Sequence, residues 1–235
     1  MLSYREIKEK TPYGPFRSRS ISEFICMNIS PFFSRYFVQW GLSPNFVTLL
    51  MIIFGVLGGI LFCIPFVWMK ILGIFFFYMW FIMDCSDGEV ARATKHFSLY
   101  GKEMDYLAHL ICHPIMNFSF WLTYVSMDKY NIIYISVIFI WFISFELISR
   151  SLIEIDVYNA KKTEIEEDVK LPSWSKYLFI QIITYPNIAI FLPIIIVADY
   201  AFGISSYYVL IIIFWAHVIG VLNEYIKKLV KYYKS

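Results

Sequence analysis

The chain has few charged residues and few cysteines, and these two shortages exclude several classes of protein. Only 16% of its 235 residues are charged, the formal net charge is +2, and no basic block is interleaved with aromatic residues, so we expect no nucleic-acid partner. The cysteines are Cys26, Cys63, Cys85 and Cys112. Because they lack the spacing of a metal site or a redox motif, we expect no disulfide.

Apolar sequence is what the chain has in excess, because 59% of its residues are hydrophobic and 20% are aromatic. This composition is typical of an integral membrane protein. Long runs with few charges predict an all-α membrane fold with six transmembrane helices. We expect these helices near residues 46–69, 71–92, 101–127, 131–153, 176–198 and 205–226.

The segment before the first transmembrane helix has a different character. Residues 20–40 are amphipathic and aromatic, which predicts an interfacial helix lying on the membrane surface; a disordered leader is the alternative. Mixed charge at residues 154–175 indicates a solvated linker or a short surface helix. We therefore divide the chain into an N-terminal segment (1–43), a six-helix membrane domain (44–226) and a basic tail (227–235).

The distribution of basic residues predicts the orientation in the membrane. With six helices, both termini lie on one side, and that side holds all but two of the 20 Lys and Arg residues. The two exceptions are Lys70 and Lys129. Since cytoplasmic loops carry an excess of Lys and Arg, we expect both termini and the loop at residues 93–100 to be cytoplasmic.

Three aspartates and a histidine interrupt the apolar sequence at helical spacing. The apolar run 71–83 is too short to cross about 30 Å of hydrocarbon, so its helix must continue through Asp84 and Asp87. Steps of three and four residues place these two on one helical face, and place Asp105 and His109 on a face of the next helix. Ionisable groups at membrane depth mark functional sites. The two facing helices would form a cage, open to the cytoplasm, for a hard divalent cation that prefers oxygen ligands.

These residues also form a long sequence pattern. From Asp84 to His109 the chain reads D-x2-D-G-x2-A-R-x8-G-x3-D-x3-H, which resembles the signature of the CDP-alcohol phosphotransferase superfamily at seven of its eight fixed positions. The superfamily has a fourth aspartate where this chain has His109. Pro44-Asn45-x2-Thr48 is similar to the segment that opens the first membrane helix in that family. The resemblance implies a homodimeric membrane enzyme that transfers a substituted phosphoryl group from a CDP-linked donor to an alcohol and releases CMP.

The resemblance also implies roles for individual residues. The metal ligands would be Asp84, Asp87, Asp105 and His109, with Mg²⁺ or Mn²⁺ as the cofactor. The nucleotide-binding residues would be Asn45, Thr48, Gly88, Ala91, Arg92 and Gly101. Residues without bulky side chains let a nucleotide approach the backbone closely, and a guanidinium presents a planar fork to phosphate.

His109 leaves three interpretations open. It could be the catalytic base, since an unperturbed imidazole pKa of about 6.5 suits proton abstraction near neutral pH. The site could instead hold one metal tightly while His109 positions the substrate, or it could be impaired or repurposed. His113, one turn further on, could hydrogen-bond to His109 or simply be a buried histidine bonded to a carbonyl. Arg150 could bind the acceptor or serve as an anchor at the membrane interface.

The leading functional hypothesis is a membrane phosphotransferase that moves a phosphoryl or phosphonyl head group from a CMP-activated donor to a membrane-embedded lipid alcohol. The alternative within the same superfamily is a CDP-diacylglycerol-dependent phosphatidyltransferase that uses a small polar alcohol. A divalent-cation transporter and a non-catalytic nucleotide-binding partner are the alternatives from other classes. Transport predicts polar residues along both halves of several helices, whereas the acids here gather at one face.

Overall fold

The protein is built from α-helices throughout the part of the chain that the structure describes. This computed structural model describes residues 2–12, 14–163 and 171–234, apart from the side chains of residues 149, 150, 152–163, 231 and 234. The helices are α1 (Tyr4–Lys10), a 3₁₀ turn (Phe16–Ser18), α2 (Ile21–Gln39), α3 (Pro44–Cys63), α4 (Val67–Thr94), α5 (Gly101–Met127), α6 (Ile132–Thr163), α7 (Trp174–Ile183), α8 (Tyr185–Phe202) and α9 (Tyr207–Lys234).

Several of these helices are suited to a membrane. Four are long and apolar enough to cross one, namely α3, α4, α8 and the Tyr207–Val230 part of α9, and Ile132–Ile148 of α6 forms a shorter apolar helix. α5 is long but is not among the four, because polar residues such as His113, Asn117 and Ser119 interrupt its apolar part. The chain is therefore a multi-pass helical membrane protein, which confirms the predicted class.

Two predicted helix extents are wrong, and in both cases a proline residue causes the difference. The helix expected over 46–69 ends at Cys63, because Pro65 disfavours helical backbone at the residue before it. The helix expected over 176–198 is divided at Thr184 into α7 and α8. Pro186 has no N–H and would clash with the preceding turn of a continuous helix, so it lies instead in the first turn of α8.

Two further segments differ from the sequence-based expectation. Residues 154–163, which were expected to begin a linker or short surface helix, continue α6. The rest of that expected linker up to residue 170 lies outside the described residues. α9 runs past residue 226 to Lys234 without a break, so the basic tail is helical in its described part.

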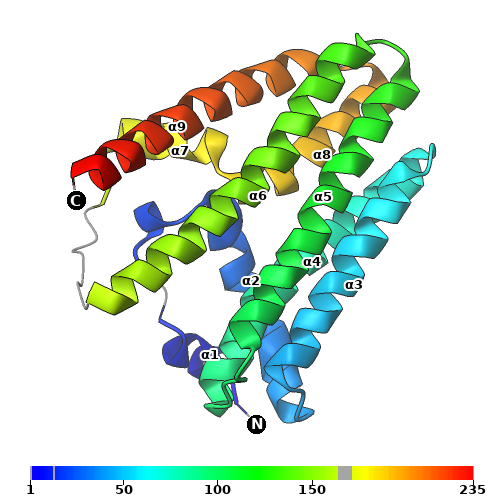
Figure 1. Cartoon of the computed structure of the whole chain (residues 1–235). Coiled ribbons are helices and arrows are strands. Elements are labelled where there is room, and N and C mark those ends of the chain that lie inside the picture. Colours follow the sequence, from blue (N-terminus) through cyan, green and yellow to red (C-terminus); the bar gives the residue numbers. More distant parts are fainter. Residues whose placement is uncertain (1, 13, 164–170, 235) are drawn as a thin grey trace.

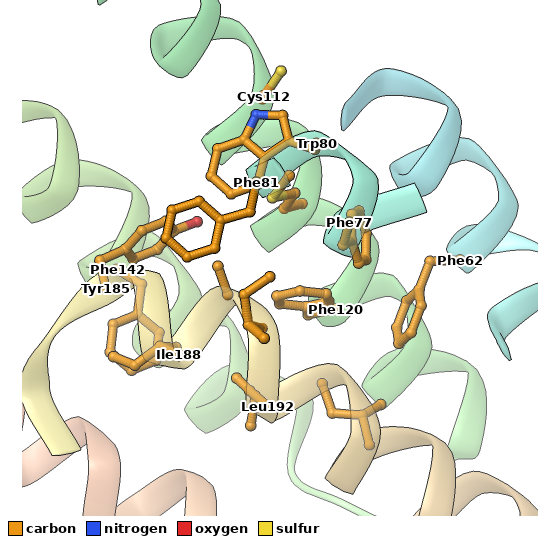
Figure 2. Close-up of a cluster of buried hydrophobic side chains, with 14 of the residues drawn as sticks. Phe62, Phe77, Trp80, Phe81, Cys112, Phe120, Phe142, Tyr185, Ile188 and Leu192 are labelled. Carbon is orange, nitrogen blue, oxygen red and sulfur yellow. The ribbon is translucent and has the colours of Figure 1, made fainter. Parts of the chain in front are cut away.

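Glycines let α3 and α4 approach each other closely. A Cβ added to Gly58 would lie 2.6 Å from Phe77 Cδ1, and one added to Gly73 would lie 2.9 Å from the carbonyl oxygen of Gly58. Next to this contact the rings of Phe62, Phe77 and Phe120 meet edge-on or tilted, within 5.8 Å between centroids. Figure 2 shows these three rings within the buried core that joins α3, α4, α5 and α8.

The turns of the bundle gather at two ends. Figure 1 shows the α3–α4, α5–α6 and α8–α9 turns at one end, and α1 with the α2–α3 and α4–α5 turns at the other. Contacts agree with this arrangement, since Lys129 Nζ donates to Asp199 Oδ1 at 2.9 Å at the first end, and Asn45 Nδ2 donates to Ser98 Oγ at 3.0 Å at the second. Lys70 belongs to the first end, because its Nζ donates to Thr123 Oγ1 at 2.9 Å.

The four cysteines are free thiols, which confirms that the chain has no disulfide among them. Burial raises the pKa of Cys26 on α2 to about 12, so this thiol stays protonated at physiological pH. A protonated, enclosed thiol behaves as a small apolar side chain.

Candidate metal and nucleotide site

Two helices bring together three side chains that could hold a metal ion. Asp84 lies near the end of α4, and Asp105 and His109 lie one turn apart near the start of α5. His109 Nε2 is 2.9 Å from Asp84 Oδ1 and 3.3 Å from Asp105 Oδ1. One ligand atom from each residue lies within 4.8 Å of the others, which is the grouping that a metal ion requires. Two carboxylates and an imidazole suit Mg²⁺ or Mn²⁺ by their chemistry.

Asp87 belongs to the same face of α4 but has a different partner. Thr48 on α3 donates a hydrogen bond from Oγ1 to Asp87 Oδ2 at 2.7 Å. The predicted pair of facing helices is therefore completed by a third helix, which holds Asp87 in place through a neutral hydroxyl.

We call Asp84, Asp87, Asp105 and His109 together the acidic group. A cavity of about 500 Å³ opens beside this group. All six residues predicted to bind the nucleotide line it, together with Asp87 and Asp105. Residues that were not predicted also contribute, since Phe97, Ser98 and Leu99 of the α4–α5 turn form part of the wall. A cavity of this volume is within the range of protein pockets for small ligands and cofactors.

Arg92 and two glycines shape the floor of this cavity. A Cβ added to Gly88 would lie 3.1 Å from a guanidinium nitrogen of Arg92, so a side chain at residue 88 would push the guanidinium away. A Cβ added to Gly101 would meet no protein atom closer than 3.5 Å. Gly101 is therefore not required by packing, and its missing side chain leaves space that belongs to the cavity.

A second, smaller cavity of about 260 Å³ lies on the α2 side of the same aspartates. It shares Asp87, Gly88, Arg92 and Asp105 with the larger cavity and is also lined by Asp84. Its remaining lining residues, none of them predicted, are Glu23, Met27, Phe81 and Cys85. Glu23 and Met27 come from the helix that the sequence indicated only as interfacial, so this helix also forms a wall of the site.

The other candidate residues have clear positions. His113 lies next to His109, with His113 Nε2 3.1 Å from His109 Nδ1, as one of the two interpretations predicted. Glu89, five residues after Asp84 on α4, accepts hydrogen bonds from Ser30 and Ser34 of α2 at 2.6 Å each. The side chain of Arg150 lies outside the described residues.

Fold and site together define a helical membrane protein in which a group of acidic side chains that could hold a divalent cation lies beside a cavity. The model of the CDP-alcohol phosphatidyltransferase family matches residues 41–222, which is most of the chain. The protein belongs to this family and is a transferase, and membership implies CMP-activated phosphotransfer to an alcohol. No curated protein sequence matches the chain significantly.

Proposed function

We propose that the protein transfers a small head group, bound through phosphate or phosphonate to CMP, onto a membrane-embedded alcohol and releases CMP. The observation that carries this proposal is that two cavities of different size meet at the same aspartates. The larger cavity suits the nucleotide, and the smaller one suits the group that is transferred or the hydroxyl that attacks it. The bond to be broken would then lie between them, beside Asp87, Arg92 and Asp105.

The carboxylate and imidazole side chains of the acidic group fit a divalent cation. Asp84, Asp87, Asp105 and His109 would hold Mg²⁺ or Mn²⁺, which when bound would neutralise charge on the phosphoryl oxygens. Arg92 would present its guanidinium to a phosphate of the donor. His109 would also accept the proton of the attacking hydroxyl, since its Nε2 points at the acidic group that both cavities adjoin.

The nucleotide would be held by the residues that line the larger cavity away from the acids. Asn45 and Ser98 are already joined by a hydrogen bond at 3.0 Å, which links the start of α3 to the α4–α5 turn. Gly101, Gly88 and Ala91 would let the nucleotide lie close to the backbone. The N-terminus of α5 at Gly101 would add a positive dipole end next to the phosphates.

The position of α2 supports a lipid acceptor. One face of α2 packs on α4 through Glu89, and another exposes a row of large apolar side chains. These are Phe24, Ile25, Ile29 and Phe32. An apolar face of this kind suits the interfacial region of a bilayer. The hydroxyl of a membrane alcohol would reach the smaller cavity beside this helix.

We also propose the topology that the sequence predicted. Six membrane crossings result if α5 and α6 each cross once and α7 and α8 together make one crossing. Lys70 and Lys129 lie at the end of the bundle opposite the acidic group, in agreement with a cytoplasmic site. The homodimer remains a prediction from the family.

The test is CMP release by the purified protein in lipid bilayers with Mg²⁺ or Mn²⁺, and with EDTA as the metal-free control. The donors would be CDP-ethanolamine, CDP-choline, CDP-glycerol, CMP-aminoethylphosphonate and CDP-diacylglycerol, each with its matching alcohol. We expect metal-dependent release from one head-group donor with a lipid alcohol. Release from CDP-diacylglycerol alone would select the phosphatidyltransferase alternative. Metal-dependent nucleotide binding without CMP release from any donor would contradict the proposed reaction.

A further inference from the structure

A line of three side chains leads from the acidic group into the interior of the bundle. His109 Nε2 faces Asp84 and Asp105, and its Nδ1 lies 3.1 Å from His113 Nε2. On the far side of His113, the Nδ1 atom lies 3.0 Å from Glu146 Oε1 on α6. Two imidazoles therefore connect the candidate metal ligands on α4 and α5 to a carboxylate on a third helix. Neither the sequence pattern nor the helical spacing indicated Glu146.

The line is buried along its whole length. His109, His113 and Glu146 are 5%, 2% and 8% exposed. The indole of Trp80 meets both imidazoles edge-on, with centroids 5.6 Å from His109 and 5.4 Å from His113. The ring of Tyr185 covers His113 at 4.4 Å. These aromatic contacts restrict the orientation of the two imidazoles.

The carboxylate at the far end decides where the protons of the two rings lie. A neutral imidazole has one N–H and one bare nitrogen. The contact between His113 Nδ1 and Glu146 is electrostatic and does not have the geometry of a straight hydrogen bond, but a bare nitrogen 3.0 Å from a carboxylate oxygen would still be repelled. The proton of His113 therefore belongs on Nδ1, and its bare Nε2 accepts from the Nδ1–H of His109.

When His109 donates from Nδ1 to His113, its own Nε2 carries no proton, and two carboxylate oxygens lie within 3.3 Å of that bare nitrogen. Three electron-rich atoms that converge without a proton between them repel one another unless a cation lies among them. If His113 instead donated from Nε2 to His109, the Nε2–H of His109 could donate to Asp84. The Nδ1 of His113 would then be bare and would face the carboxylate of Glu146. The buried carboxylate on α6 thus favours the tautomer of His109 that can bind a metal.

We propose that Glu146 is a positioning residue for the metal site, and that it acts through His113 by keeping the Nε2 of His109 bare. This inference rests on the metal site of the proposed function. Residues that orient a metal-binding histidine in this way change metal affinity about 10- to 100-fold when they are replaced. Glu146→Gln keeps the side-chain shape and removes the charge, so we expect Mn²⁺ affinity to fall about tenfold.

Two readouts separate this role from a structural one. Mn²⁺ binding to the protein in nanodiscs is measured by electron paramagnetic resonance, without any substrate. Ring ¹⁵N chemical shifts report the tautomers directly, and the chain has only four histidines to assign. With Mg²⁺ bound we expect His113 to carry its proton on Nδ1 in the wild-type protein, and to lose that preference in Glu146→Gln.

A double-mutant cycle tests whether Glu146 acts only through His113. His113→Phe keeps a ring but removes the hydrogen-bond acceptor, so it should weaken Mn²⁺ binding as Glu146→Gln does. The double variant should bind Mn²⁺ no more weakly than His113→Phe alone. Asp199→Asn is the matched control, because it removes another buried carboxylate at the opposite end of the bundle.

Four outcomes would overturn the inference. Unchanged Mn²⁺ affinity and an unchanged His113 tautomer in Glu146→Gln would refute it and leave the proposed function intact. Additive losses in the cycle, or an equal loss in Asp199→Asn, would reduce Glu146 to a packing residue. A wild-type protein that binds no Mn²⁺ would refute both this inference and the metal site on which it rests.

Discussion

Replacing Ser30 and Ser34 with alanine should loosen α2 from the rest of the bundle. Both hydroxyls donate to the carboxylate of Glu89 at 2.6 Å, and that carboxylate is fully buried, so water cannot replace a lost donor. A hydrogen bond to a charged group contributes about 1.5–3 kcal/mol. Each single substitution should therefore lower the free energy of opening of α2 by about that amount. The double substitution should lower it by less than the sum, because both hydroxyls serve one carboxylate.

The assay is amide hydrogen exchange of residues 21–39 in nanodiscs. Each 1.4 kcal/mol corresponds to a factor of ten, so exchange in a single variant should accelerate roughly tenfold to a hundredfold. Transfer activity should fall in parallel, because α2 carries Glu23 and Met27 of the smaller cavity.

Ser86→Ala is the matched control for this prediction. Ser86 is as buried as Ser30 and Ser34, but its hydroxyl donates to the carbonyl of Ile82 in its own helix at 2.7 Å. We expect its replacement to leave α2 unchanged. If the double variant of Ser30 and Ser34 exchanged no faster in α2 than Ser86→Ala, the argument that Glu89 holds this helix would fail.

Three further predictions concern the site itself. Asp105→Ala should reduce CMP release to background and abolish Mn²⁺ binding, because it removes a ligand; substantial remaining turnover would contradict the cage. Gly101→Ala should fold normally, since its Cβ meets no atom closer than 3.5 Å, yet bind cytidine nucleotide at least tenfold more weakly by calorimetry; equal affinity would place the nucleotide elsewhere. Glu23 forms a capping box with Ser20 at the start of α2, and Glu23→Gln keeps this box but removes the charge from the smaller cavity, so the KM of a cationic head-group donor should rise. The control is Glu6→Gln in the equivalent capping box of α1, which should leave the KM unchanged.

Much of the candidate site could be predicted because its residues are neighbours on single helices. Asp105 and His109 are one turn apart, and helical geometry alone places them together. Helical geometry also places Glu89, five residues after Asp84, on a different face of α4. It could not show where Glu89 points, because the serines that bind it are more than 50 residues earlier in the chain. The smaller cavity was missed for the same reason, since α2 reaches the site only through tertiary packing.

The extents of the helices were predictable where proline or charge marks an end, and less so elsewhere. Pro65 and Pro186 account for two breaks, and both can be read from the sequence once each is taken as a helix-breaking residue. The continuation of α6 through residues 154–163 could not be read in this way, because mixed charge is compatible with a surface helix and with a linker alike.

The sequence by itself determined the membrane class, the helical faces that carry Asp84 and Asp105, and the family, because these depend on composition and on spacing within a few turns. Only the tertiary structure decided that Glu146 contacts His113 and that α2 forms one wall of the smaller cavity. These pairings join residues that lie far apart along the chain. Their contacts arise from the way whole helices pack, and no local pattern of residues records that packing.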